Sequence, residues 1–313
     1  MDFKNLPELI RYFSDEKVGW AYLEQQKWDG KPACPHCGTE KVYRIKGGNS
    51  FKCGNKSCDC RFTAKVGSIF ENSKIPLSKW YAAIYIATAH KKGISSLQLG
   101  RDLGVTQKTA WFMMHRIREL VKLNNDVELS DTIQVDETYV KGKMKNKSKK
   151  VRKMIAEGLK EDTTTIVLGG VENGGKGFLR VIPNTYHETL KPIIQEMASD
   201  AGTTLVTDSA SFYNGMDQIY TAHITVNHSE FEYVNKEGYH TNQIEGFFSL
   251  LKRGIIGIYH YTSTKHLQRY CDEFSYRYNT RKIKDADRFQ LTMQNTSGRL
   301  KYCDLIKKES ISQ

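Results

Sequence analysis

Four polar side chains in the second half of the chain have a spacing that could bring them together for chemistry: Asn242, Glu245, Ser249 and Lys252. On a helix, which turns about 100° per residue, they would lie within about 60° of Glu245. The apolar residues between them follow the i, i+3, i+4, i+7 pattern of one buried helical face, and they are Ile244, Phe247, Phe248 and Leu251. We expect a helix, capped by Thr241, that exposes an amide, a carboxylate, a hydroxyl and an ammonium along one line. An ordinary surface helix would show the same stripe. Other residues of the chain are therefore needed to tell a catalytic helix from a surface helix.

Two more acids lie earlier, in segments with the spacing of strands. Asp136 lies inside a strand-like run that contains Ile133 and Val135 and ends at Val140, and Asp208 lies at the end of a predicted buried strand, 203–207. A carboxylate in a central strand is costly to bury unless it is paired or bound to a metal ion. Taken alone, each acid could instead be an N-cap, an edge-strand acid or a turn residue.

The order of elements around these acids is typical of a ribonuclease-H-like domain. Strands are predicted at 131–141, 163–171, 177–182, 203–207 and 223–226, and helices at 187–201, from 212, at 240–254 and at 267–281. A hairpin turn at 172–175 makes part of the sheet antiparallel, and helical crossovers make the rest parallel. This order places Asp136 in the first strand, Asp208 at the end of the fourth, and Glu245, 37 residues after Asp208, on a later helix.

Cysteines near the N-terminus have the spacing of a metal site. Five of the seven lie between residues 34 and 60. Cys34 and Cys37 form a CxxC knuckle, and Cys53 and Cys58 supply a second pair beyond a hairpin that turns at 46–49. Four thiolates bind zinc tetrahedrally and stabilise a core too small to fold alone. Cys60 competes with Cys58, which we prefer because Cys60 is close to Phe62, the expected anchor of the hairpin end. Because four cysteines leave no open position, this zinc is expected to be structural.

A helix-turn-helix is predicted between residues 77 and 122. A short helix, Gly104-Val105 and a longer helix capped by Thr106 follow one another, as in that DNA-binding motif. The side chains expected in the major groove are Gln107, Lys108 and Thr109. Arg116 and Arg118 are expected nearer the phosphates. An ordinary small helical bundle remains the alternative.

Charge and hydropathy narrow the class of partner. The 313 residues carry a net charge of +12 with a pI near 9.2, which favours nucleic acid over membrane as partner. The basic run 141–153 is either a solvated loop or a phosphate contact. Residues 1–20 lack the apolar run of a signal peptide, and no stretch is long enough to span a bilayer. The clustered cysteines indicate a reducing compartment, so we expect a soluble, cytoplasmic protein associated with the nucleoid.

The motifs together resemble a known family. They read CPHC…CGNKSC, GSIFENSKIPLSKWY, VDETYVKGK, TDSASFY and HTNQIEGFFSLLKRGIIGIYHYTSTKHLQRYCDEFSYRYNTR, within residues 5–285. The chain is similar to the zinc-ribbon insertion-sequence transposases of bacteria and archaea, which carry a DDE-type catalytic domain. The segment HTNQIEGFFSLLKRG is the most specific part of the resemblance.

The resemblance implies two Mg²⁺ ions, which Mn²⁺ could replace, between three carboxylates. Asp136 would bridge both ions, and Asp208 and Glu245 would each hold one. Some family members have Asn and a following Lys at the third position, so Asn242 stays as second candidate or co-ligand, although a carboxylate offsets divalent charge better than an amide. Lys252 would meet a phosphate near the scissile bond.

Further contacts follow from the same resemblance. Arg253 is a further DNA contact. The zinc ribbon and the helix-turn-helix would bind the terminal inverted repeats of double-stranded element DNA. Because two element ends must be joined to target DNA, a homo-oligomer is expected. The residues that could support the acids are Glu137, His228, His240 and Arg281.

The predicted architecture is therefore α/β, with a ribonuclease-H-like catalytic domain preceded by a four-cysteine zinc ribbon and a helix-turn-helix region. The expected boundaries are 1–70 for N-terminal helices and ribbon, 71–125 for the helix-turn-helix, 126–290 for the catalytic domain and 291–313 for a polar tail. Two alternatives remain. A non-catalytic DNA-binding regulator would tolerate replacement of the three acids, and a related nuclease would cleave strands without joining them.

Overall fold

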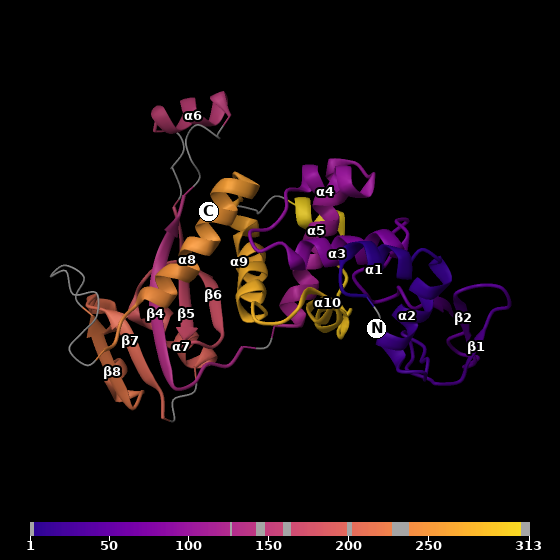
Figure 1. The fold of residues 1–313 in the computed structure, drawn as a ribbon, viewed down its shortest axis with the longest axis horizontal. Coiled ribbons are helices and arrows are strands. Elements are labelled where there is room, and N and C mark those ends of the chain that lie inside the picture. The colour runs from indigo at the N-terminus through magenta and orange to yellow at the C-terminus, as the bar shows by residue number, and fades with distance from the viewer. Residues whose placement is uncertain are drawn as a thin grey trace. The chain divides into compact units, whose positions relative to one another are not determined.

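The computed structural model describes residues 3–125, 127–141, 148–158, 164–198, 202–226 and 238–307. The chain divides into two compact units, drawn in Figure 1. The first contains Met1–Asn124 and Lys282–Gln313, and the second contains Asn125–Arg281.

The first unit combines helices with a small antiparallel sheet of order β1-β2-β3. Its elements are α1 (Leu6–Tyr12), α2 (Glu16–Trp28), β1 (Val42–Arg44), β2 (Ser50–Cys53), β3 (Arg61–Thr63), α3 (Leu77–Ala89), α4 (Ser96–Leu103), α5 (Gln107–Leu123), α10 (Asp285–Met293) and α11 (Tyr302–Ile306). Between α4 and α5 the chain turns at Gly104, which has a φ of 61° and ends α4 in the left-handed region that glycine tolerates. The Thr106 hydroxyl then accepts from Thr109 N–H and caps α5, as predicted.

The C-terminal segment belongs to the first unit, which differs from the predicted boundary at 290 and the separate tail. Phe289 of α10 is fully buried, and its ring lies 5.5 Å from that of Phe3 and 6.1 Å from that of Tyr81 on α3. Burying this ring against aromatic partners more than 200 residues away is favourable. The pattern of residues 285–293 gives no hint of these partners, so the sequence could not set the boundary.

The second unit is a five-stranded sheet with helices on both faces. Its elements are β4 (Thr132–Val140), α6 (Lys149–Ala156), β5 (Thr165–Glu172), β6 (Gly177–Ile182), α7 (His187–Met197), β7 (Thr204–Asp208), β8 (Ala222–Val226), α8 (Asn242–Gly254), a π-helical turn (Ile255–Tyr259) and α9 (Thr264–Asn279). The strand order is β6-β5-β4-β7-β8, with β4, β5 and β6 antiparallel and β4, β7 and β8 parallel. This is the predicted ribonuclease-H-like order, and the α/β fold class is confirmed.

Each face of the sheet has its own hydrophobic cluster. Ile133 and Val135 of β4 pack with α7 on one face. On the other, Val140 and the buried residues of α8 pack with α9. Because strand side chains alternate between faces, Asp136 shares the α8 face with Val140.

Three local details differ from expectation. Between β7 and β8 lie only two short 3₁₀ turns, Ser211–Tyr213 and Met216–Gln218, because Gly215 between them adopts a φ of 84° that interrupts a helix. Residues 149–153 of the predicted basic loop belong to α6, which continues to Ala156, whereas 142–147 lie outside the described residues. Thr241 precedes α8 but makes no capping hydrogen bond through its side chain.

Candidate active site

Asp136 and Asp208 lie on neighbouring parallel strands. The register pairs Gln134 of β4 with Val206 of β7, so two residues further along, Asp136 stands level with Asp208 on the same face. The backbone N–H of Ala210 donates to Asp208 Oδ1 over 3.1 Å and orients that carboxylate. The backbone N–H of Glu137 donates to Asp136 Oδ1 over 2.8 Å.

A glycine lets α8 approach the sheet beside Asp136. Gly169 of β5 is the cross-strand partner of Asp136. A Cβ added there would lie 2.7 Å from both Ile244 Cδ1 and Phe248 Cε1 of α8, closer than carbon atoms can pack. The missing side chain thus sets the helix directly over the strand pair, with Glu245 next to the buried Ile244.

Gln134 ties the N-terminus of α8 to β4, a role that the sequence analysis did not identify. Its side chain is buried, with 2% exposure. Gln134 Oε1 accepts from the backbone N–H of Gln243 at 3.0 Å and of Ile244 at 3.2 Å. These are N–H groups that the first turn of a helix leaves without an intrahelical partner. A buried amide two residues before Asp136, in an otherwise apolar strand segment, was the available clue.

The side chain of Gln243 extends this attachment to the β5–β6 turn. Gln243 Oε1 accepts from Gly174 N–H over 2.9 Å, and Gln243 Nε2 donates to Asn173 Oδ1. Arg281 donates to Gly175 O over 2.8 Å, so this predicted supporting residue holds the same turn. The start of α8 is therefore fixed from two sides.

The two faces of α8 are as predicted. Ile244, Phe247, Phe248 and Leu251 are buried. The polar stripe is exposed along its length, and its residues are Asn242, Glu245, Ser249 and Lys252. Arg253, also exposed, donates from Nε to Ser249 O over 3.1 Å. The helix thus presents Glu245 near its start and two cations near its end.

Burial and neighbouring charge act together on Asp136. Burial raises the pKa of Asp136 to about 7, and the carboxylates of Glu137, Asp208 and Glu245 add to that increase, against a hydrogen bond from the Glu137 backbone that lowers it. Negative charges thus converge on one partly buried group. A cation at this place would relieve their repulsion.

The residues predicted to support the three acids lie in different environments. Glu137 lies on the opposite face of the sheet, where Tyr213 Oη donates to Glu137 Oε2 over 3.0 Å; burial raises the pKa of Glu137, although this hydrogen bond lowers it. His240 Nδ1 lies 3.4 Å from Gln134 Nε2. His228 lies outside the described residues.

The oxygen donor set suits a hard cation such as Mg²⁺, yet the acids are less closely grouped than the cysteines. Among the residues that the structure describes, only Cys34, Cys37, Cys53 and Cys58 form a group of three or more such ligands within 4.8 Å of one another. The carboxylates of Asp136, Asp208 and Glu245 are spread more widely over their shared face.

The four cysteine sulfurs have the spacing of a closed tetrahedral site. Cys34 Sγ lies 3.8 Å from Cys58 Sγ, and Cys37 Sγ lies 3.6 Å from Cys53 Sγ. Zn–S bonds of about 2.3 Å at tetrahedral angles would set sulfur atoms about 3.8 Å apart. The site therefore fits structural zinc, and the structure leaves Cys60 outside the group. Trp28, Phe51 and Phe62 pack beneath it.

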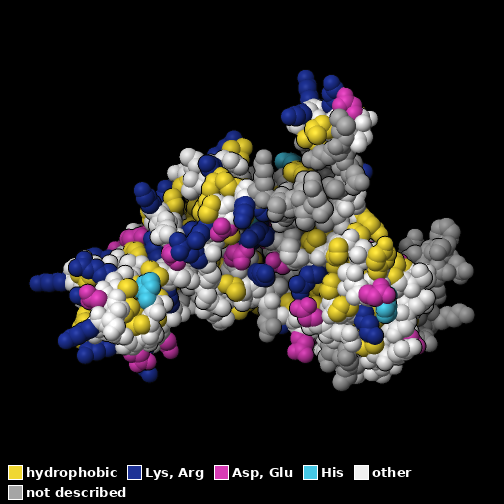
Figure 2. All heavy atoms as spheres, turned by 180° about the vertical axis from the view of Figure 1, so that it is seen from behind, with side chains coloured by type: hydrophobic (Ala, Val, Ile, Leu, Met, Phe, Trp, Pro, Cys, Tyr) yellow, Lys and Arg dark blue, Asp and Glu magenta, His cyan; other side chains and the backbone are white. Residues whose placement is uncertain are grey.

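The surface of the zinc ribbon is basic. Its exposed cations between residues 31 and 61 are Lys31, Lys41, Arg44, Lys46, Lys52, Lys56 and Arg61, against exposed Glu40 and Asp59. Figure 2 shows blue side chains gathered at the end of the first unit that holds the ribbon. This excess of positive charge suits a polyanion.

The predicted base-contacting residues stand at the start of α5, whereas Arg116 differs from its prediction. Gln107 and Lys108 are exposed and Thr109 is half-buried; Lys108 Nζ lies 4.9 Å from the centre of the Tyr302 ring. Arg116 is buried and donates to Ile69 O over 2.8 Å and to Leu300 O. It is not placed to contact phosphates, because segments distant in the sequence cover it. Arg118 is buried too, with 2% exposure.

Within the part of the chain that the structure describes, no helix has the length and apolar character needed to cross a membrane.

Two parts of the chain are similar to domains of known transposases. Residues 14–61 match the transposase zinc-ribbon domain of the IS1595 group, and residues 128–279 match the ISXO2-like transposase domain of the same group. An uncharacterized protein in transposable element ISH50 of Halobacterium salinarum is 27% identical over 257 residues, which cover 78% of this chain and 84% of that protein. A chain of a pre-cleavage Mos1 transpososome aligns with 95% of this chain and 98% of its own length, at 11% identity and a TM-score of 0.24.

Proposed function

Because the chain belongs to the zinc-ribbon insertion-sequence transposases of the IS1595 group, we propose that its second unit cleaves and joins DNA strands at the ends of an insertion sequence. One observation carries the proposal. Asp136 and Asp208 share one face of adjacent strands, and Glu245 is presented by the helix packed on that face. These acids lie within the span that matches the transposase domain.

Each residue has a distinct part in the proposed reaction. Asp136 would help to hold both of two Mg²⁺ ions, or Mn²⁺ in their place, and Asp208 and Glu245 would each help to hold one. When bound, the two ions activate a water or a DNA 3′-OH and stabilise the leaving oxygen. Asn242, one turn before Glu245 on the exposed stripe, is the alternative or additional ligand.

The remaining contacts would hold DNA. Lys252 and Arg253 lie about 10 Å beyond Glu245 along α8 and would bind phosphates beside the scissile bond. The basic ribbon and the start of α5, with Gln107, Lys108 and Thr109, would bind the terminal inverted repeats. A homo-oligomer would bring two element ends together, and the site of action would be the nucleoid in the cytoplasm.

The test is a cleavage assay on duplex DNA that carries the element's own end, with Mg²⁺. The wild type is compared with Asp208→Asn, which keeps the oxygen that accepts from Ala210 N–H, and with Asp217→Asn as a matched control on an exposed acid nearby. We expect the wild type and the control to nick at the element boundary, and Asp208→Asn to bind without cutting.

Two other results would replace the proposal. Binding without cleavage by the wild type with either Mg²⁺ or Mn²⁺ would make the chain a DNA-binding regulator. Cleavage without joined products would make it a nuclease.

A further inference from the structure

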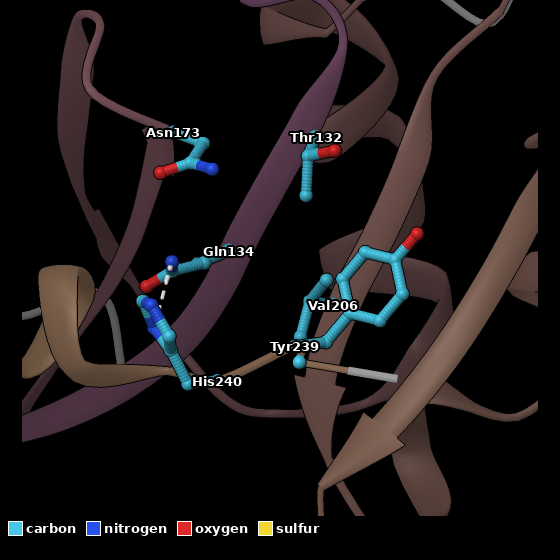
Figure 3. Close-up of a pocket in the computed structure, with 7 residues that line it drawn as sticks. Thr132, Gln134, Asn173, Val206, Tyr239 and His240 are labelled. Atoms are coloured by element: carbon cyan, nitrogen blue, oxygen red, sulfur yellow. Dashed lines mark hydrogen bonds between the residues drawn. The ribbon is translucent and has the colours of Figure 1, made fainter. Parts of the chain in front are cut away.

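A small cavity opens on the α8 face of the sheet beside the acids. Gln134 and Val206 line it, and these register partners lie two residues before Asp136 and Asp208 on the same strands. At about 3.3 Å per residue, the cavity lies about 7 Å from the acids. Tyr239 and His240, which lead into α8, line it as well. Figure 3 shows Gln134 and Asn173 on one side and the Tyr239 ring with Val206 on the other.

The cavity has the size of one small ring. Its volume is about 120 Å³. An engineered cavity of about 150 Å³ in another protein admits benzene, so a six-membered ring is close to the largest planar group that could enter fully. A bicyclic ring would have to protrude.

The lining suits a neutral ring with polar edges. None of the described residues that line it is Lys, Arg, Asp or Glu. Tyr239 and His240 offer aromatic rings for stacking. Because Asn173 Oδ1 accepts from Gln243, the Asn173 amide is oriented, and Figure 3 shows its nitrogen on the side toward Tyr239. This nitrogen has no hydrogen-bond partner among the described residues and can donate to a ring carbonyl.

The cavity and the acids lie in line along α8. From the start of the helix to its end lie the cavity, then Glu245 over Asp136, then Lys252 and Arg253. A DNA strand following this line would place phosphates at the two cations, a phosphate at the acids, and the next base at the cavity. A base can enter only when it is unstacked and unpaired.

We propose that this cavity holds one unpaired pyrimidine base of the DNA strand next to the phosphate at the acids. The proposal rests on the proposed function and extends it. The Tyr239 and His240 rings stack on the base, as aromatic side chains do in proteins that bind single strands. The Asn173 amide donates to a carbonyl of the pyrimidine.

The test uses 5-methyl-2-pyrimidinone, a fluorescent pyrimidine with a single ring, whose emission rises when it leaves the base stack. It is placed in turn at each position flanking the cleavage site of the element-end duplex, with Ca²⁺ in place of Mg²⁺ to permit binding without cutting. We expect emission to rise at one position with the wild type. The purine 2-aminopurine at that position should show a smaller relative rise, and an equal rise would overturn the size argument.

Two variants test the lining, each with a readout independent of cleavage. Tyr239→Ala should return the emission to the level of free duplex while Tyr239→Phe, which keeps the ring, should not. Asn173→Asp keeps the acceptor for Gln243 and loses the donor, so it should also reduce the emission. An abasic site at the responsive position should weaken wild-type binding and leave Tyr239→Ala binding unchanged, since both remove the same contact.

The experiments distinguish a failure of the base cavity from a failure of the proposed function. If the wild type cleaves the end DNA with Mg²⁺ but no position responds, or if the response persists in Tyr239→Ala, the base cavity is refuted and the proposed function stands. If the wild type neither binds nor cleaves that DNA, both are refuted.

Discussion

The cysteine site and the carboxylate site of this chain are built in opposite ways. The cysteines lie within 25 residues of one another, and their sulfur atoms meet at 3.6–3.8 Å above a small aromatic cluster. The acids come from segments separated by 72 and 37 residues, and a sheet register, a missing side chain and one buried amide bring them onto one face. A closed site that completes a small core holds its metal rigidly, whereas a site spread over a sheet and a helix leaves room for substrate.

If the ribbon depends on its metal, losing one ligand should have the largest effect. Binding of structural zinc supplies about 10 kcal/mol or more to small domains of this kind. Cys58→Ser should therefore abolish zinc binding and hydrogen-exchange protection between residues 34 and 63, and leave the sheet of the second unit protected.

Cys60→Ser is the matched control, because Cys60 lies outside the group. It should retain zinc and protection. Zinc loss in Cys60→Ser but not in Cys58→Ser would mean that the ligand set is misassigned.

The carboxylate site should instead be sensitive to the fit between α8 and the sheet. Gly169→Ala introduces a Cβ at 2.7 Å from Ile244 and Phe248. Overpacking of this kind costs about 1–3 kcal/mol, and a displacement of about 1 Å can slow catalysis about 100-fold. Urea unfolding and the DNA cleavage rate would measure the two effects.

Gly246→Ala provides the contrast on α8 itself. A Cβ there meets nothing within 4 Å, so alanine should stabilise the helix by about 0.5–1 kcal/mol. Equal effects of the two substitutions would argue against close packing beside Asp136.

A smaller effect is expected from the amide that ties α8 to β4. Gln134→Leu leaves the N–H groups of Gln243 and Ile244 without their acceptor, which should cost about 1 kcal/mol or more and lower the cleavage rate. Gln134→Glu keeps an acceptor oxygen and should preserve the unfolding midpoint better. If both variants unfold like the wild type, the attachment does not contribute to stability.

The difference between the two sites also explains what could be predicted from the sequence. The cysteine pairs, the two faces of α8 and the order of the strands along the chain depend on local spacing and periodicity. Gln134, Gly169 and Arg116 depend on distant partners: α8 for the first two, and Ile69 and Leu300 for the third. Arg116 in particular has the spacing of an exposed cation, and the packing of the segments that contain Ile69 and Leu300 buries it. The place of residues 282–313 in the first unit also depends on partners distant in the sequence.

We propose that the carboxylates on the α8 face hold the metal ions that cut DNA. Asp136→Cys tests this proposal, because a sulfur ligand is poorly suited to Mg²⁺ and better accepted by softer metal ions such as Mn²⁺. The cleavage rate of element-end DNA would be measured for the wild type and the variant with each ion. We predict that the wild type cuts with both, and that Asp136→Cys fails with Mg²⁺ and recovers part of its activity with Mn²⁺. Cleavage by Asp136→Cys with Mg²⁺ at the wild-type rate would show that Asp136 does not hold a catalytic ion.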